Sequence, residues 1–266
     1  SSIYQIKDYY KKITSQKCCS VFHYNESLGE KNSVKKAEQE LKNRYESLEN
    51  KYDKFLAENY DYKANTYETN KINLLSNPTS LYTKQPTVYY GLMYLAKNAK
   101  KEVKIHTPYI ICNDYMYNEL KNIKVPTTIM TNSAENNGNI FGAVDYLNHK
   151  KDIINTGVTI KEYEGGISYH GKSMTIDDDI AIVGSFNMDM RSAYIDTELM
   201  LVINSKDINK QLKASMEEYE KKAATVKNET EYSHIPEGMK MKELSDKKKN
   251  IKAWFGWAMN GLRFLF

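Results

Sequence analysis

The sequence predicts an α/β sandwich, in which helices cover a mixed β-sheet. From about residue 79 the chain alternates helical segments with short apolar strands, which is typical of an α/β domain. Three strand-like segments then follow in close succession, which predicts that the sheet is mixed. Of the 266 residues, 41% are apolar, which is enough for a hydrophobic core in one or two domains.

The elements of this domain follow from apolar periodicity and from the residues that end each segment. Helical spacing predicts helices at 88–99, 114–123, 139–155 and 208–226. Short apolar or alternating runs predict strands at 103–111, 127–132, 158–164, 168–177, 180–187 and 197–204.

Two amphipathic segments flank the domain. In the segment 33–60, one helical stripe collects Val34, Ala37, Leu41, Tyr45, Leu48, Tyr52 and Phe55. Because the stripe covers under four heptads, a helix packed on a domain is favoured over a free coiled coil. Near the end of the chain, a second helical face collects Ile251, Trp254, Phe255, Ala258, Leu262 and Leu265. We expect this tail to lie in a membrane interface, with the preceding lysines 247–249 near anionic headgroups; docking on the protein's own core is the alternative.

Composition excludes several classes of protein. Lys and Arg number 38 against 34 Asp and Glu, so the net charge is only +4, and nucleic acid is an unlikely partner. The cysteines at positions 18, 19 and 112 indicate free thiols in a reducing compartment. No signal peptide is visible, and no apolar run approaches the roughly 20 residues that a membrane span needs.

The strongest functional signal is the pattern H-x-K-x4-D-x6-G-S-x-N. Its residues are His170, Lys172, Asp177, Gly184, Ser185 and Asn187. Six fixed identities at fixed spacing make a chance match improbable.

Strand geometry predicts that the polar groups of the pattern converge. His170 and Lys172 share one face of an extended strand, as do Ser185 and Asn187 on the next strand. With a two-residue hairpin turn at 178–179, Lys172 lies opposite Ser185, and His170 lies opposite Asn187. A shift of one residue in this register would scatter the patch, so the pattern predicts the short turn.

These residue types suit phosphoryl chemistry. The His170 imidazole can attack phosphorus or protonate a departing alcohol near neutral pH. Lys172 and Asn187 can donate hydrogen bonds to phosphoryl oxygens as their charge grows. We expect Glu198 to accept a bond from Nδ1–H of His170, which leaves Nε2 free. Asp177 sits at the turn and is assigned a structural role.

Other polar residues favour plainer interpretations. The acidic triplet 177–179 predicts a turn rather than a metal site, because one turn supplies too few converging ligands. His23, His106, His149 and His234 have no comparable neighbours in the sequence and are interpreted as satisfied core or surface residues. No metal or cofactor is needed for the chemistry that the motif suggests.

The motif resembles the HKD signature of the phospholipase D superfamily. Three further stretches, 107–110, 130–137 and 184–205, resemble the C-terminal half of bacterial cardiolipin synthase-like proteins, as does the short aromatic tail. A Glu at the distance of Glu198 from the motif also fits these relatives. The resemblance implies a phospholipase D-like α/β/α sandwich, with an N-terminal and a C-terminal amphipathic helix. It also implies exchange of alcohols on a phosphodiester through a phosphohistidine intermediate.

Such relatives use two motif halves, whereas the full pattern occurs once here. The resemblance divides the chain into a remnant after an upstream first half (1–30), a helix with its connector (31–78), the second half (79–230) and a membrane-associating tail (231–266). The complete site would need that missing half or a second copy of the chain. In relatives the C-terminal histidine tends to be the acid/base, so His170 is assigned general acid/base first and nucleophile second.

Three functions follow as hypotheses. The first is a phosphatidyltransferase that makes cardiolipin from phosphatidylglycerol, bound peripherally at the cytoplasmic side of the membrane with anionic phospholipid as partner. The second is a phosphodiesterase or nuclease of the same superfamily, which the nearly balanced charge disfavours. The third is a non-catalytic, membrane-associated half-domain.

Overall fold

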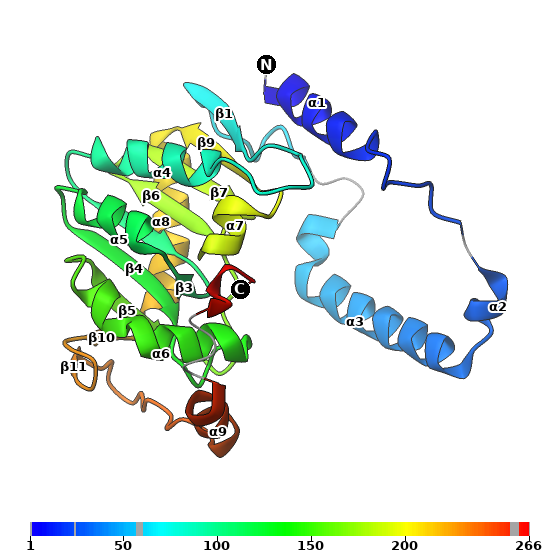
Figure 1. Cartoon of the computed structure of the whole chain (residues 1–266). Coiled ribbons are helices and arrows are strands. Elements are labelled where there is room, and N and C mark those ends of the chain that lie inside the picture. Colours follow the sequence, from blue (N-terminus) through cyan, green and yellow to red (C-terminus); the bar gives the residue numbers. More distant parts are fainter. Residues whose placement is uncertain (1, 24, 57–60, 256–260, 266) are drawn as a thin grey trace. The chain divides into compact units, whose positions relative to one another are not determined.

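The computed structural model describes residues 2–23, 25–56, 61–255 and 261–265 (Figure 1). The chain forms two compact units, residues 7–68 and the remainder, which are taken separately below.

Helices dominate the smaller unit. They are α1 (Ser2–Thr14), which begins in the larger unit, α2 (Glu26–Gly29) and α3 (Asn32–Leu56). The Asn25 side chain begins α2 by accepting from the Leu28 N–H, as helix N-caps do. Helix α3 confirms the expected amphipathic helix, with a kink at Tyr52, and the last expected positions, 57–60, lie outside the described residues. Within this unit the stripe is exposed, with Leu41 at 65% and Tyr45 at 55%, and its packing on a domain stays a prediction.

A nine-stranded mixed sheet forms the centre of the larger unit, in the order β1-β9-β7-β6-β2-β4-β5-β10-β11. Its strands are β1 (Lys71–Ser76), β2 (Val103–His106), β4 (Thr127–Asn132), β5 (Thr159–Tyr163), β6 (Ser173–Ile176), β7 (Ile180–Gly184), β9 (Leu199–Asn204), β10 (Ala223–Val226) and β11 (Tyr232–His234). The β2–β4 and β4–β5 pairs are parallel, and the other neighbours are antiparallel. The predicted mixed sheet is therefore confirmed.

Helices cover both faces of this sheet (Figure 1). On one side lie α4 (Thr87–Lys97), α5 (Asp114–Lys121) and α6 (Ile140–Ile154), and α8 (Lys206–Glu220) lies on the other. The core contains Tyr89 and Met116 from the first group, packed with Ile105, Ile129 and Ile182 of the central strands, all at most 4% exposed. Burial of these large apolar side chains is the main stabilising term of the sandwich.

Several expected elements differ in extent. The strand expected at 103–111 divides into β2 and β3 (Ile110–Ile111), and β3 pairs in parallel with β8 (Met188–Asp189) as a separate ribbon. The helix expected at 208–226 ends at Glu220, because 223–226 form strand β10, in which 223–225 pair with β5. Strand β1, which precedes the first expected element of the domain, pairs with β9 along its whole length. The segment of β10 is only four residues long and begins with two alanines, which are depleted in strands, so its local preference is too weak to reveal the pairing with β5.

The tail also differs from the expected single helix. Helix α9 spans Asp246–Phe255, five residues earlier than expected, and Arg263–Leu265 form a 3-10 turn. The expected contributions of Phe255 and Ala258 lie outside the described side chains. Lys248 is 8% exposed and donates to the backbone oxygens of Ala134, Glu135 and Asn137, so it is not available to a headgroup. Among the described helices, none is long and apolar enough to cross a membrane.

Candidate active site

His170 and Lys172 lie together at the edge of a cavity. Both precede β6 in the irregular stretch 168–172, rather than on the strand expected at 168–177. The Lys172 Nζ is 2.9 Å from Nδ1 of His170 and 2.8 Å from its backbone oxygen. His170 is exposed and lines a cavity of about 400 Å³ with Pro108, Tyr109, Asn137, Gly138, Asn139 and Ser168.

The Lys172 Nζ lies 2.9 Å from Nδ1 of His170 and 3.4 Å from Nε2. Because an ammonium has only donors, the shorter contact favours a neutral ring that accepts at Nδ1 and carries its proton on Nε2. Partial burial and the Lys172 charge both lower the pKa of His170 below its ordinary value. Burial also lowers the pKa of Lys172, although the carboxylates of Glu198 and Asp189 oppose this effect. The arrangement therefore favours the neutral form of His170 over the charged form.

The predicted hairpin register is wrong by one residue. Ile176 pairs with Ile180, so the loop has three residues (177–179) instead of two. Lys172 consequently lies opposite Gly184, whose N–H donates to the Lys172 oxygen, rather than opposite Ser185.

The extra loop residue is stabilised by a distant segment. Asp177 adopts a left-handed backbone with φ 51°, which Asp tolerates better than most residues. Its carboxylate accepts from the N–H groups of Lys100, Lys101 and Glu102, and its own N–H donates to the Glu102 oxygen. Partial burial alone would raise the pKa of Asp177, but these donors outweigh it and lower the pKa. The structural role expected for Asp177 thus has a concrete basis, and 177–179 form a turn as expected.

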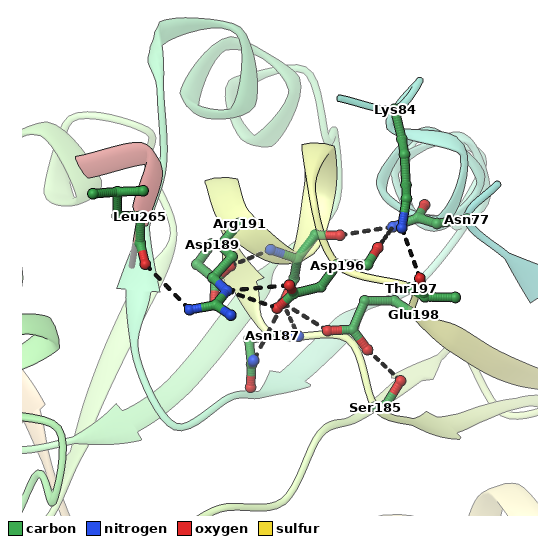
Figure 2. A network of polar contacts seen from close by, with 11 residues as sticks. Asn77, Lys84, Ser185, Asn187, Asp189, Arg191, Asp196, Thr197, Glu198 and Leu265 are labelled. Atoms are coloured by element: carbon green, nitrogen blue, oxygen red, sulfur yellow. Dashed lines mark hydrogen bonds and ion pairs between the residues drawn. The ribbon is translucent and has the colours of Figure 1, made fainter. Parts of the chain in front are cut away.

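Ser185, Asn187 and Glu198 form a second group, connected by a serine (Figure 2). One Glu198 oxygen accepts from the Ser185 hydroxyl and the other from the Ser192 hydroxyl, the latter at 2.9 Å. Nδ2 of Asn187 donates to the same Ser192 oxygen at 3.2 Å. The expected bond from Nδ1–H of His170 to Glu198 is wrong, because Nδ1 contacts Lys172 and the Glu198 oxygens accept from the two serine hydroxyls. Burial raises the pKa of Glu198, although the two serine bonds oppose the rise.

The two groups lie next to each other without a direct bond. The Glu198 carboxylate is close enough to act on the pKa of Lys172, and Lys172 pairs with Gly184, the residue before Ser185. The one-residue shift does not scatter the patch, because 170–172 precede β6 and 185–187 follow β7. Both stretches lie off the regular ladder, so strict alternation of faces does not apply to them. Oδ1 of Asn187 is buried and has no hydrogen-bond donor among the described residues.

Four supporting residues were missed by sequence reasoning. Ser192, which is fully buried on α7 (Met190–Tyr194), joins Asn187 to Glu198. Asp189 caps α7 through the Ser192 N–H, and burial raises the pKa of Asp189 to about 6. Nζ of Lys84 donates to Thr197 Oγ1, and Asn77 donates to the oxygens of Ser192 and Asp196 (Figure 2). Asn77 and Lys84 precede the residues from which the site was predicted, and no sequence pattern links them to it.

The other histidines were correctly interpreted. His106 is buried between Glu220 and Tyr169, each at 3.2 Å from a ring nitrogen, and His149 contacts Asp152 at 2.9 Å. His23 and His234 are exposed. Across the described part of the chain, no three His, Cys, Asp or Glu side chains are grouped so that they could hold a metal ion.

The sequence around this site matches a known protein family. Residues 92–219 match the family described as "Cardiolipin synthase, PLD-like domain", a range that includes every site residue from His170 to Glu198. This chain carries a phospholipase D-like domain. The phospholipase D-like domain is distantly related to bacterial cardiolipin synthases over about half of the chain.

Two curated relatives and one solved structure illustrate the likeness. Cardiolipin synthase 1 of Staphylococcus epidermidis (strain ATCC 12228) is 30% identical over 59% of this chain and 32% of its own length. A cardiolipin synthase of Staphylococcus aureus (strain Mu50) is 31% identical over 47% of this chain and 26% of its own. The chain thus spans about a third or less of these relatives. The phosphatidylserine synthase structure of Haemophilus influenzae Rd KW20 has the same fold, with a TM-score of 0.52 and 15% identity over 73% of this chain and 48% of that one.

Proposed function

We propose that the phospholipase D-like domain exchanges alcohols on a phospholipid phosphodiester, most specifically converting two phosphatidylglycerol molecules into cardiolipin and glycerol. The observation that carries the proposal is the position of His170, which contacts Lys172 and lines a cavity. An imidazolium can donate a proton to a leaving alkoxide, and the neutral imidazole that results can accept one from the incoming alcohol. The cardiolipin synthases of Staphylococcus support the choice of lipid.

In the proposed reaction, a histidine nitrogen supplied by a second motif attacks the phosphorus and forms a phosphohistidine. The bond to glycerol breaks, and the glycerol oxygen takes the Nε2 proton of His170, which begins this step as the imidazolium and ends it as the neutral imidazole. The hydroxyl of a second phosphatidylglycerol then returns a proton to His170 and attacks the phosphohistidine, which releases the first histidine and forms cardiolipin. Lys172 and the Asn187 amide would donate to the phosphoryl oxygens, once Nδ2 of Asn187 turns from Ser192.

The proposal therefore includes a partner and a surface. A second H-x-K-x4-D half, in the same gene product or in a second copy of the chain, would face the exposed His170. The tail would hold the domain peripherally on anionic phospholipid at the cytoplasmic side, because Trp254 is 76% exposed and the neighbouring residues Lys247, Lys249 and Lys252 are also exposed.

The test supplies phosphatidylglycerol vesicles to the chain, alone and together with any motif half that its gene encodes upstream. Mass spectrometry measures cardiolipin, and a coupled assay measures glycerol. We expect both products with the active form, and a loss of at least about a thousandfold with His170→Ala, because the proton carrier is absent. His234→Ala, which changes an exposed histidine of β11, is the matched control and should keep full activity.

Each alternative gives a different result. Phosphatidate with glycerol, and no cardiolipin, would indicate hydrolysis in place of transfer. Cleavage of single-stranded DNA without lipid turnover would favour a nuclease. Turnover of neither substrate by any form would leave the non-catalytic half-domain as the function.

A further inference from the structure

The stretch that carries His170 is held by side chains rather than by a strand neighbour. Residues 167–169 run beside the loop that follows β4, outside the regular sheet. Nδ2 of Asn136 donates to the Ile167 oxygen at 3.2 Å, and the Gly138 N–H donates to Oγ of Ser168 at 3.0 Å. The shortest of these contacts come from Asn132, the last residue of β4.

Asn132 pairs with both backbone groups of the residue before His170. The Tyr169 N–H donates to Oδ1 of Asn132 at 2.8 Å, and Nδ2 donates to the Tyr169 oxygen at 2.9 Å. A carboxamide presents one donor side and one acceptor side in a plane, as a peptide group does. Asn132 therefore replaces the missing strand neighbour of Tyr169.

The same carboxamide also reaches the wall of the cavity. Its second N–H donates to the Pro108 oxygen at 2.8 Å, and its oxygen accepts a further bond from Nδ2 of Asn136 at 3.0 Å. Pro108 lines the cavity beside His170. Asn132 is 1% exposed, and all four of its hydrogen-bonding positions are used. A side chain bonded in this way has no freedom left, which makes it a rigid reference for two segments of the site.

The Tyr169 ring is held separately. Its hydroxyl lies 3.2 Å from Nδ1 of His106, and the ring contacts Tyr163 and Tyr219 edge-on. These contacts do not depend on Asn132, so the loss of the carboxamide frees the Tyr169 backbone while its ring stays anchored.

We propose that Asn132 is a positioning residue that fixes His170 relative to the cavity by pairing with both backbone groups of Tyr169 and with the Pro108 oxygen. The inference rests on the proposed function of His170 as proton carrier. Displacement of a reacting group by about 1 Å can cost on the order of a hundredfold in rate, so loss of this pairing should lower kcat more than it raises KM.

The test compares Asn132→Ala with Asn209→Ala. Asn209 is a matched control, because it is also buried (2% exposed) and donates to a backbone oxygen, that of Ile180, at 2.7 Å, on α8 at a distance from His170 in the fold. Two readouts are measured in the active form used above: kcat and KM with phosphatidylglycerol vesicles, and the NMR titration of the His170 ring, assigned with His170→Asn. Melting temperature reports stability in both variants.

We expect Asn132→Ala to lower kcat at least tenfold, with KM changed less than threefold, and to move the His170 titration toward its ordinary value. Asn209→Ala should lower the melting temperature to a similar degree and leave both readouts unchanged. Wild-type kcat and titration in Asn132→Ala would overturn the inference, as would equal kcat losses in the two variants. If the wild type has no lipid turnover, the proposed function fails, and the NMR titration of His170 alone then tests the role of Asn132. Failure of the proposed function and failure of this inference therefore give different results. Should Asn132→Ala not fold, Asn132→Asp, which keeps the acceptor and loses both donors, carries the same expectation.

Discussion

At the scale of single residues, the hydrogen-bond donors that contact His170 and Glu198 determine the electrostatics of the site. Lys172 occupies Nδ1 of His170, while the two serines occupy both oxygens of Glu198. The imidazole is therefore held by an ammonium rather than by a carboxylate, which disfavours its protonated form. A neutral His170 suits the step of the proposed acid/base cycle in which the incoming alcohol gives up its proton, whereas protonation of the leaving alcohol needs the imidazolium.

The first residue-scale prediction concerns the titration of His170. Burial and the Lys172 charge both lower its pKa, so removal of the charge in Lys172→Gln should raise the pKa toward the ordinary value without reaching it. NMR titration of the ring measures the change. Lys121→Gln, at an exposed position at the end of α5, serves as control and should leave the titration unchanged. A pKa in Lys172→Gln that equals or falls below that of the wild type would contradict the assigned contact.

At the scale of elements, the β6–β7 hairpin sets where the two groups of the site meet. Its three-residue loop is fixed by Asp177, whose carboxylate reaches the amides before β2. Strand β7 then leads to Ser185, and α7 brings Ser192 back onto Glu198 at the start of β9. The hairpin thus supports the site from its far end without touching substrate.

The element-scale prediction is that Asp177→Asn lowers the free energy of unfolding by about 1 to 2 kcal/mol, as expected for loss of charge-assisted hydrogen bonds. Asn keeps the tolerance for a left-handed backbone, so the effect isolates the charge. Because the folded pKa of Asp177 is lowered, its contribution is full above the unfolded value of about 3.8 and is lost as the pH falls through the folded pKa. The difference between wild type and variant in urea unfolding should therefore shrink below pH 3.8.

Asp179→Asn is the control for this measurement. The backbone oxygen of Asp179 accepts from the Ser205 N–H, and the substitution leaves this bond in place. Its unfolding free energy should stay within about 0.5 kcal/mol of the wild type. A difference between Asp177→Asn and wild type that does not change with pH would argue against the charged bonds.

At the scale of the whole molecule, two cations attach the tail to the rest of the larger unit. Lys248 donates to the loop at 134–137, and Arg263 pairs with the buried Asp145 at 2.7 Å and donates to the Cys112 oxygen. The loop at 134–137 follows Asn132 and leads to the cavity wall. These attachments orient α9 with Lys248 inward and Trp254 outward, which places the exposed aromatic residue on the unit that holds His170.

The prediction at this scale is that Trp254→Ser weakens binding to phosphatidylglycerol vesicles about tenfold, since a buried aromatic ring contributes roughly 1.5 to 3 kcal/mol. Cosedimentation measures the change, and wild-type binding should fall with added salt because lysines surround the ring. Tyr94→Ser removes a similarly exposed ring, 57% accessible on α4, and should bind as the wild type does. Unchanged binding by Trp254→Ser would remove the tail from the proposed membrane contact.

Local patterns in the sequence determined the α/β class, the positions of most helices and strands, and the residues of the motif. Apolar periodicity indicates which face of a segment is buried. The fixed spacing of His170, Lys172, Ser185 and Asn187 indicates a group of polar residues suited to the same chemistry. These signals act within a few residues of each other, so one chain without a structure is enough to detect them.

Only the tertiary structure decided the contacts between distant segments. The loop length depends on amides that lie 77 residues before Asp177, and the backbone before His170 depends on an asparagine that lies 37 residues before Tyr169. The donors to Glu198 likewise depend on how α7 folds back onto β9. A buried polar group takes whichever partner the packed chain brings within about 3 Å, and that choice is not encoded in the residues beside it.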